Sequence, residues 1–338
     1  MASNKGELKM KRNKMVFMAL IAAMMAFTVP IFAEDEAEEK SPFGLKLVTD
    51  FAYYPKSDAI PGGTHFAPIT GIYDSVEIRT TLTASYTLAT PLGENFLLKD
   101  ANVAFKGGLE LTPVSIRPKL SVDFTPVPFL IFSAGTSIGW GWNIGGIEGL
   151  CVLNTVNYDY EKLSTFSHPY YDFWAGATFQ FDTGAIIKGD WTHVVILASY
   201  TTTYSGIAGL DDYSVYEWQC GKGKACGLSY EFQGVLGYQM PLPLTLAGML
   251  FKVTGYYDGA VYGSFDNTYD GDFAEISISP LARFNFGDKD ELTCLFDFSS
   301  QRSFETEYSK PGEKLITNVT GREWFFKRIA FSWTHKFM

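Results

Sequence analysis

Alternation of apolar and polar side chains runs through most of this sequence and restricts its fold more than any other feature. In residues 115–125, one set of alternate positions is charged or hydroxylated: Arg117, Lys119, Ser121 and Asp123. Most positions between them are apolar, namely Ile116, Leu120, Val122 and Phe124. Because successive side chains of an extended chain point to opposite faces, the pattern predicts a strand with one polar and one apolar face.

The same period of two recurs from residue 43 to the end of the chain. Each repeat has about the 9 to 11 residues, or slightly more, that a tilted strand needs to cross a bilayer. The pattern predicts about twelve strands, at residues 43–54, 73–90, 101–112, 114–125, 129–143, 170–181, 185–204, 227–240, 244–257, 273–286, 291–301 and 323–337. Ten or fourteen strands are the alternatives, since "CVLNTVNYDY" and "DDYSVYEWQ" would add a hairpin if they were extended.

The connections between these segments alternate in length. Short, turn-rich breaks occur at "TPLGEN", "TPVP", "DTG", "MPLPL" and "GDKDE". Longer segments separate them, at residues 56–71, 145–169, 205–225, 258–272 and 302–321. Only the connection near Pro113 is short where a long one is due. Short turns at one end and long loops at the other are typical of an up-and-down transmembrane barrel, and an even strand number places both termini on the periplasmic side.

A soluble β-sandwich also alternates, so the choice of lipid over a soluble core depends on further features. Nearly every predicted strand has one face that is apolar along its length. A closed barrel is the only kind of sheet in which all backbone N–H and C=O groups are hydrogen-bonded within hydrocarbon. Aromatic residues also gather near the strand ends, as interfacial girdles would require: Tyr53, Tyr54, Trp140, Trp142, Tyr170, Tyr171, Tyr256, Tyr257, Trp324 and Phe325. We therefore predict an all-β fold, a transmembrane antiparallel up-and-down β-barrel.

The N-terminal residues predict a segment that is removed from the mature chain. Several lysines and Arg12 precede an apolar run over residues 15–32, and an acidic stretch follows Ala33. This arrangement is typical of a secretory signal peptide at residues 1–33, with a membrane-anchor helix as the alternative. A short acidic periplasmic segment at residues 34–42 and the barrel at 43–338 complete the predicted organisation. After Ala33 no apolar run approaches the roughly 20 residues of a spanning helix.

Composition excludes several classes of protein. With 46% hydrophobic residues and a formal net charge of -10 over 338 residues, the chain is neither disordered nor basic enough for nucleic acid. Its four cysteines are too few for a disulfide scaffold. Cys220 and Cys226 in "CGKGKAC" suit a small disulfide loop better than a metal site, because no histidine is near. We expect no metal and no cofactor.

The final strand, in "RIAFSWTHKFM", alternates up to the end of the chain. Here the sequence resembles the bacterial outer-membrane β-barrel class, whose last strand carries an aromatic-rich signal read by the barrel-assembly machinery. In that class the last residue is usually aromatic, whereas here Met338 follows Phe337. The overall pattern also looks like the porin-like proteins of spirochaetes. The resemblance implies location in the outer membrane, with its lipid and the assembly machinery as partners.

If the apolar face meets lipid, the polar face lines the barrel interior. The pore-lining candidates are Glu77, Arg79, Lys106, Glu110, Arg117, Lys119, Asp123, Glu231, Lys252, Glu275, Arg283, Asp297 and Arg328, with Lys46, Asp50, Asp172 and Lys336 on the same face. A barrel of about twelve strands has a narrow interior, so the pattern predicts a porin-like channel for passive diffusion of small polar solutes. Pairing of these charges across a plugged interior is the alternative, and residues 145–169 are the best candidate for a segment that folds inward.

Two other functions are alternatives to the channel. The first is a closed barrel whose long loops form an adhesin or binding surface. The second is a lipid hydrolase or a transporter of hydrophobic substrates. A hydrolase needs a serine and a histidine held together. Ser167 adjoins His168, but adjacent residues of a strand point to opposite faces, so we predict that the protein is not an enzyme.

Two prolines conflict with the strand pattern. Pro118 and Pro280 lie inside predicted strands, where proline deletes a ladder hydrogen bond. We expect each of them at a bulge or near a rim, where a missing donor costs least.

Overall fold

The computed structural model describes residues 41–58, 60–154, 159–307 and 316–338. The predicted signal peptide and nearly all of the acidic segment lie outside the described residues. Among the residues described, no helix is long and apolar enough to cross a membrane.

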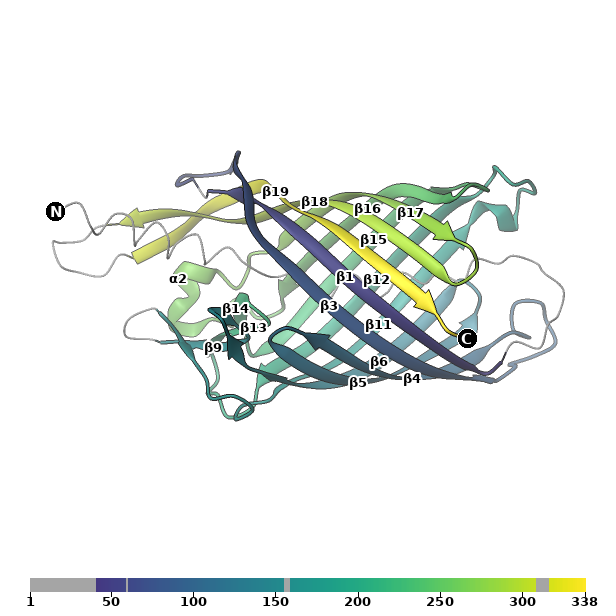
Figure 1. Cartoon of the computed structure of the whole chain (residues 1–338), viewed down its shortest axis with the longest axis horizontal. Coiled ribbons are helices and arrows are strands. Elements are labelled where there is room, and N and C mark those ends of the chain that lie inside the picture. Colours follow the sequence, from purple (N-terminus) through teal and green to yellow (C-terminus); the bar gives the residue numbers. More distant parts are fainter. Residues whose placement is uncertain (1–40, 59, 155–158, 308–315) are drawn as a thin grey trace.

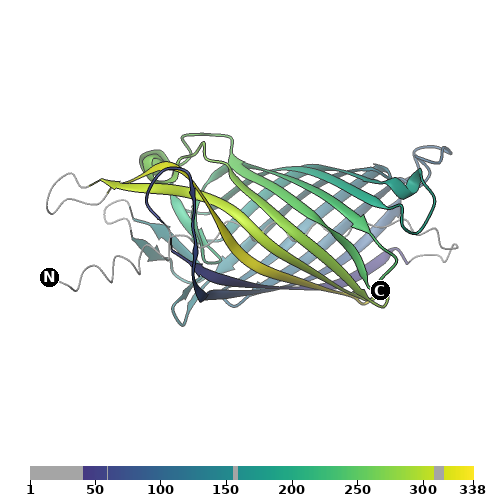
Figure 2. The ribbon, with the colours of Figure 1, turned by 90° about the horizontal axis from the view of Figure 1, so that it is seen from above.

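Within the described residues, twelve long antiparallel strands form a closed barrel, which Figures 1 and 2 show as a tube of tilted strands. Pairing of the first strand with the last closes the ring, in a register that runs from Lys46 opposite Lys336 to Tyr53 opposite Ile329. The strands are β1 (Phe43–Ser57), β3 (Ile69–Ala89), β4 (Asn102–Thr112), β5 (Ser115–Val127), β6 (Leu130–Gly141), β11 (Tyr170–Asp182), β12 (Val194–Ile207), β15 (Gly227–Gln239), β16 (Leu244–Tyr256), β17 (Glu275–Phe286), β18 (Asp290–Glu307) and β19 (Ile316–Lys336). A short further strand, β2 (His65–Phe66), pairs with β19 in parallel.

All twelve predicted strands overlap a barrel strand, so the predicted fold is confirmed. The largest error is at the predicted strand 185–204, whose counterpart β12 begins at Val194. The residues before it form the 3₁₀ turn η3 (Thr183–Ala185), where the Asp182 carboxylate accepts a hydrogen bond from the Gly184 N–H. The described residues of "CVLNTVNYDY" and "DDYSVYEWQ", the two segments that gave the higher alternative strand count, contribute strands that pair outside the barrel sheet.

The two ends of the barrel differ in their connections. The start of β1 and the end of β19 lie at one end, called the terminal end, near the label C in Figure 1. Short connections at residues 90–101, 128–129, 183–193, 240–243 and 287–289 lie there too. The opposite, loop end carries the connections at residues 58–68, 142–169, 208–226 and 257–274. Residues 113–114 form the short exception that the sequence predicts.

The outer wall of the barrel is apolar. Leu82 of β3 lies opposite Leu47 of β1 and Leu109 of β4, and its side chain is exposed on the outside. Phe51 is likewise opposite both Ile78 and Phe331. Neighbouring outward side chains from successive strands therefore form a continuous apolar belt, as a wall in contact with lipid tails requires.

Two long connections fold back and pair with each other at the loop end (Figure 1). Strands β9 (Leu150–Leu153) and β10 (Tyr160–Lys162) come from one connection, and β13 (Val215–Trp218) and β14 (Gly221–Ala225) come from the other. They form a sheet in the order β10-β9-β13-β14, which we call the inserted sheet. The first connection, which also contains β7 (Asn143–Ile144) and β8 (Ile147–Glu148), is the one expected to fold inward. The second was not expected to do so.

A third connection covers the inserted sheet. Residues 257–274 contain η4 (Gly263–Phe265) and the helix α2 (Asp266–Tyr269). Their aromatic side chains pack with residues of the inserted sheet in one buried cluster, which contains Leu153, Val215, Ala225, Val261, Tyr262, Phe265 and Tyr269. Three connections therefore share a single small core at the loop end.

Pro118 lies where a proline in a barrel strand was expected. It is near the start of β5, and therefore close to the loop-end rim. The β5–β6 ladder pairs Ile116 with Trp140 and Lys119 with Ser137 and omits the two pairs between them. That gap agrees with the missing N–H of the proline.

The expectation for Pro280 is wrong. Pro280 lies in the middle of β17, opposite Met249 of β16, and the β17–β18 ladder passes it without a change of register. This ladder also omits two pairs between Ile278 and Leu281, namely those of residue 279 and of Pro280 itself. The barrel accepts the loss of ladder hydrogen bonds here without a bulge.

The apolar belt predicts a cost for a charge on the outer wall. Replacing Leu82, near the middle of β3, by arginine should lower the free energy of unfolding in lipid vesicles by about 2 to 4 kcal/mol. Leu92→Arg is the matched control, because Leu92 is exposed in the connection 90–101 and should change stability by less than about 1 kcal/mol. Urea titration of both variants measures the difference. Equal effects of the two substitutions would contradict a lipid-facing belt at Leu82.

Candidate functional site

The barrel encloses a cavity of about 590 Å³ between its inner wall and the inserted sheet. Residues from all twelve described barrel strands, β1 to β19, and from the inserted sheet line it together. Among the described residues the lining includes eight basic side chains, Lys46, Lys106, Arg117, Lys119, Lys222, Lys224, Arg283 and Arg302, and five acidic ones, Asp123, Asp172, Glu231, Glu275 and Glu291. A chain with a net charge of -10 therefore has a cavity in which basic groups outnumber acidic ones.

The structure describes all thirteen predicted pore-lining residues and places each of them on the inner side of the wall. Seven line the cavity itself: Lys106, Arg117, Lys119, Asp123, Glu231, Glu275 and Arg283. Five are buried in contacts along the wall: Arg79, Glu110, Lys252, Asp297 and Arg328. Glu77 accepts a hydrogen bond from the Tyr54 hydroxyl at 2.8 Å. The predicted strand face is thus the inner face, and many of its charges contact one another.

Glu110 is the centre of the largest group of charges. Its carboxylate accepts hydrogen bonds from Arg117 at 3.0 Å and from Lys119 at 2.5 Å. Gln219, from the turn between β13 and β14, donates to the other oxygen at 2.8 Å. A fully buried carboxylate is costly unless it is paired and hydrogen-bonded, and these three donors satisfy it. The same contacts attach the inserted sheet to the barrel wall.

Arg117 extends this group towards β11. Its Nη1 lies 3.6 Å from a carboxylate oxygen of Asp172, which also accepts a hydrogen bond from Ser137 at 2.7 Å. The guanidinium carbon lies 5.8 Å from the centre of the Tyr170 ring, in cation–π range. Strands β4, β5, β6 and β11 are therefore joined on the inside by one set of polar contacts.

A second group of charges lies beside the seam between β1 and β19. Asp50 accepts two hydrogen bonds from Arg79, at 2.8 and 3.1 Å, and a third from the Ser332 hydroxyl at 2.7 Å. Arg328 donates to Asp297 at 3.2 Å and to the Tyr54 hydroxyl at 3.2 Å. These contacts link side chains across the pairing that closes the barrel.

Other cations of the inner wall differ in whether they have a carboxylate partner. Lys106 pairs with Asp123, Lys252 with Glu231 at 3.2 Å, and Arg283 with Glu291 at 3.3 Å. Among the residues that the structure describes, Lys46 and Lys224 line the cavity without an ion pair. Burial, followed by the nearby Arg117 guanidinium, lowers the pKa of Lys224 to about 8, so this group is still mostly protonated at pH 7.

Part of the inner wall is apolar, which the sequence pattern does not predict. Five buried residues from β12, β15, β16, β17 and β18 line the cavity: Leu197, Val235, Leu246, Leu281 and Leu295. In "LTCLFDFSS", Leu295 occupies the same face as Thr293 and Asp297, so it interrupts an otherwise polar face. One such interruption is weak evidence by itself. Only the pairing of the strands shows that these five apolar residues lie together on the inner wall.

The tip of the inserted sheet is held against the wall by Trp218 and Gln219. The Trp218 ring stacks on Tyr170, with ring centres 4.8 Å apart, and it covers Gly139, where a Cβ atom would lie 2.6 Å from it. Gln219 and Cys220 form the turn with φ of 53° and 59°, a left-handed conformation that costs energy in residues other than glycine. Hydrogen bonds from Gln219 to Glu110 and Ser115 offset this cost.

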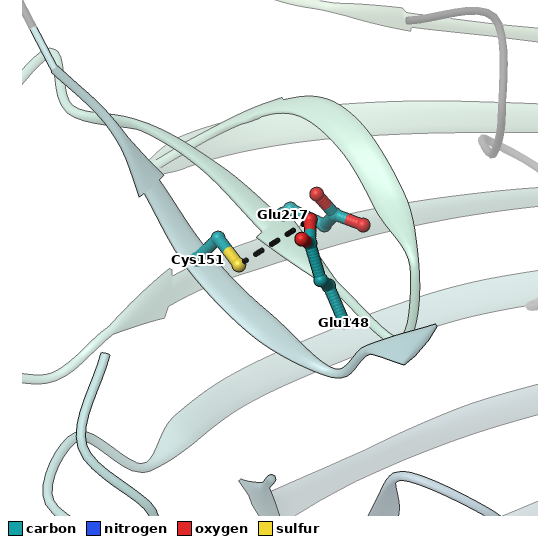
Figure 3. A group of neighbouring side chains, drawn as sticks. All are labelled: Glu148, Cys151 and Glu217. Carbon is teal, nitrogen blue, oxygen red and sulfur yellow. Dashed lines mark hydrogen bonds between the residues drawn. The ribbon is translucent and has the colours of Figure 1, made fainter. Parts of the chain in front are cut away.

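One group in the inserted sheet has the composition of a metal site. The ligand atoms of Glu148, Cys151 and Glu217 lie within 4.8 Å of one another, and Figure 3 shows the thiol directed at Glu148. Each carboxylate also has a lysine partner, Lys162 at 3.8 Å and Lys222 at 3.7 Å. Because the lysines already balance the negative charge, the group acts as an ion-pair cluster that joins β8, β9, β10, β13 and β14.

The predicted disulfide between Cys220 and Cys226 is not present. Both are free thiols, as are Cys151 and Cys294. Strand β14 runs between Cys220 and Cys226, and five extended residues span far more than the roughly 7 Å that a disulfide allows between Cα atoms. The sequence suggested a loop here, whereas the chain forms an extended strand.

No protein-family model matches the sequence, and no curated protein matches it. Solved structures resemble the fold at low sequence identity. An outer membrane channel from Pseudomonas putida F1 is 11% identical with a TM-score of 0.40, and the match covers 90% of this chain and 99% of that chain. For the KdgM porin the identity is 7% and the TM-score 0.36, over 87% of this chain and 99% of that chain. The translocator domain of autotransporter NalP from Neisseria meningitidis is 12% identical with a TM-score of 0.36, over 87% and 88%.

The free thiols predict a simple titration result. Protein refolded without reductant and then unfolded should bind four equivalents of a thiol reagent, one for each cysteine. In the folded protein the reaction should be slow, because burial raises the pKa of Cys151 and of Cys220 to about 12 and leaves little thiolate. Titration of only two thiols after unfolding would contradict the structure and would point to a disulfide.

Proposed function

We propose that the protein is a porin-like channel of the bacterial outer membrane through which small polar solutes diffuse passively. The observation that carries this proposal is the charged cavity inside a closed barrel with an apolar outer wall. Such a wall suits lipid, and an interior lined by ionised side chains suits water. Polar solutes are the natural occupants of an interior of that kind.

The inserted sheet would control the width of this channel. It occupies the loop end and is attached to the wall through Trp218 and Gln219. The cavity lies against its lysine-bearing strand β14, so solute must pass the edge of the sheet or displace it. We infer a narrow channel with low conductance rather than a wide aqueous pore.

The orientation follows from the two ends of the barrel. Transmembrane barrels have short periplasmic turns and longer extracellular loops, so the terminal end would face the periplasm and the loop end the exterior. In this orientation both termini are periplasmic and β19 is available to the barrel-assembly machinery. The predicted resemblance to spirochaete porin-like proteins stays a prediction.

Burial weakens the argument for a loop-based adhesin. A loop-borne binding surface would use exposed aromatic side chains, and the aromatic-rich segment "DDYSVYEWQ" lies in a long connection, yet Val215, Tyr216 and Trp218 are buried in the inserted sheet. Tyr213 remains exposed at its edge. Most of this surface therefore serves the interior of the protein, which favours a channel over a partner-binding role.

A hydrolase also has little support. Ser167 and His168 are closer than strand geometry predicts, with the hydroxyl oxygen 2.5 Å from Nδ1, because they lie in a loop after Phe166, whose φ is 63°. The same hydroxyl donates to the Ser164 carbonyl at 2.6 Å. No carboxylate among the described residues hydrogen-bonds to His168. We propose that the protein has no enzymatic activity.

The channel proposal is tested by electrical recording. The refolded protein, inserted in a planar bilayer in potassium chloride, should give stable single-channel currents. A difference in migration between unheated and heated samples on a denaturing gel confirms that the protein has folded as a barrel. Correctly folded protein that stays silent over many insertions would contradict a channel and would support the closed binding barrel.

Weakening the attachment of the inserted sheet should raise the conductance. Trp218→Ala removes a fully buried aromatic side chain and should destabilise the sheet by about 3 to 5 kcal/mol, so that it leaves the loop end more often. Larger or noisier single-channel currents are expected. Trp191→Ala is the matched control, because Trp191 is exposed in a terminal-end connection and should leave the conductance unchanged. Unchanged currents in Trp218→Ala would show that the sheet does not limit the channel.

A further inference from the structure

The cavity has two walls of opposite chemistry. The apolar wall consists of Leu197, Val235, Leu246, Leu281 and Leu295, one from each of five consecutive strands. Leu197 is paired with Val235 and Leu281 with Leu295, so the side chains are direct cross-strand neighbours. An apolar surface of this extent is unfavourable in a lumen filled only with water and ions. We call these five residues the leucine strip.

The other wall is basic. Lys46 of β1, Lys106 of β4 and Lys119 of β5 line the same cavity, and Lys224 approaches it from β14 of the inserted sheet. In the ring of twelve described strands, β4 and β16 are diametrically opposite, since the order β4-β5-β6-β11-β12-β15-β16 covers half of it. The leucine strip is centred on β16. The basic wall and the leucine strip therefore face each other across the cavity.

The charges of the cavity do not cancel. The described lining residues include eight basic and five acidic groups, and Glu110 and Glu217 behind the lining neutralise part of this excess by pairing with Arg117, Lys119 and Lys222. Four of the acidic groups, Asp123, Asp172, Glu231 and Glu291, are already in ion pairs with wall cations. Lys46 and Lys224 have no ion-pair partner among the described residues. An anion in the cavity would supply the missing negative charge.

We propose that the cavity binds small amphiphilic organic anions, with the acidic head on the basic wall and the apolar body against the leucine strip. This assignment rests on the proposed channel as the route by which the ligand reaches the cavity. A volume of about 590 Å³ is within the range of small-molecule sites. The class includes short-chain fatty carboxylates and the corresponding sulfonates or phosphates.

Simpler ligands satisfy only one wall. An inorganic anion would neutralise Lys46 or Lys224 and leave the leucine strip in water. A neutral apolar molecule would cover the strip and leave the excess positive charge in place. An amphiphilic cation would place its charge in a cavity that already has more basic than acidic groups. Only an anion with an apolar body matches both walls at once.

The test is direct binding to the refolded full-length protein in detergent. The probes are hexanoate, acetate, 1-hexanol and hexyltrimethylammonium, and isothermal titration calorimetry measures each affinity. Fluorescence of Trp174 and Trp218, which line the cavity, gives a second readout. Hexanoate should bind at least about tenfold more tightly than acetate, since burial of its extra methylene groups is favourable, and more tightly than the other two probes. Equal affinity for hexanoate and acetate, or preference for the cation, would overturn the proposal.

Two substitutions locate the site. Lys46→Gln should weaken hexanoate binding about fivefold by removing a charge from the basic wall. Val235→Thr keeps the side-chain shape but makes the leucine strip polar, and should weaken hexanoate about threefold while leaving acetate unchanged. Lys99→Gln, in an exposed connection, and Val253→Thr, on a residue whose cross-strand partner is Phe232 rather than a lining residue, are the matched controls. Weaker hexanoate binding in the two control variants, or unchanged hexanoate binding in the two cavity variants, would refute this location.

Electrical recording separates failure of this proposal from failure of the channel. Currents that hexanoate and acetate block equally would contradict the ligand class and leave the channel intact. Hexanoate binding by a protein that carries no current would contradict the channel and leave the cavity site intact.

Discussion

The structure depends on the pairing of β1 with β19. In hydrocarbon an unpaired backbone N–H or C=O costs several kcal/mol, and an open sheet would leave two whole edges of such groups. The antiparallel register from Lys46–Lys336 to Tyr53–Ile329 removes both edges. On the inner side of the same seam, Asp50 accepts hydrogen bonds from Arg79 and Ser332, so side chains join three adjacent strands. Closure thereby separates one face of every strand from the other.

This separation explains the placement of charge. Ionised side chains that lipid would not accept gather inside, where most of them pair. Buried ion pairs add little net stability, but breaking one leaves a costly isolated charge, so they fix the position of what they contact. Glu110 illustrates this, because Arg117, Lys119 and Gln219 must all reach it. The inserted sheet is thereby held at one place in the loop end.

The barrel strands are predictable because their signal is local. A period of two is visible in any ten residues, and all twelve predicted segments overlap a strand of the described barrel. The predicted charged face is also the inner face, since alternation assigns faces without reference to distant residues. The arrangement inside the barrel is different. Pairing of β9 with β13 joins residues far apart in sequence, and neither segment differs in pattern from an ordinary loop hairpin.

The features that the sequence does not predict correctly depend on contacts between residues of different strands or on the conformation of the chain between them. Cys220 and Cys226 are close in sequence, but an extended strand between them keeps them apart, and their spacing cannot reveal its conformation. Pro280 violates the ladder in mid-strand because the neighbouring pairs hold the register without it. The leucine strip is invisible in any one strand, since each strand contributes a single residue to it. It becomes a binding wall only when five strands are in register.

In every strand of the closed barrel, one of two adjacent residues faces lipid and the other faces a water-filled cavity. Leu82 and Thr83 of β3 test this arrangement most directly, because Leu82 is exposed on the outer wall and Thr83 lines the cavity. Spin labels at each position, in protein whose four native cysteines are replaced by serine, report collisions with lipid-soluble oxygen and with a water-soluble nickel complex. In lipid vesicles, the label at 82 should collide with oxygen and the label at 83 with nickel. Equal nickel accessibility at both positions, or the reverse pattern, would contradict this assignment of the outer and inner faces.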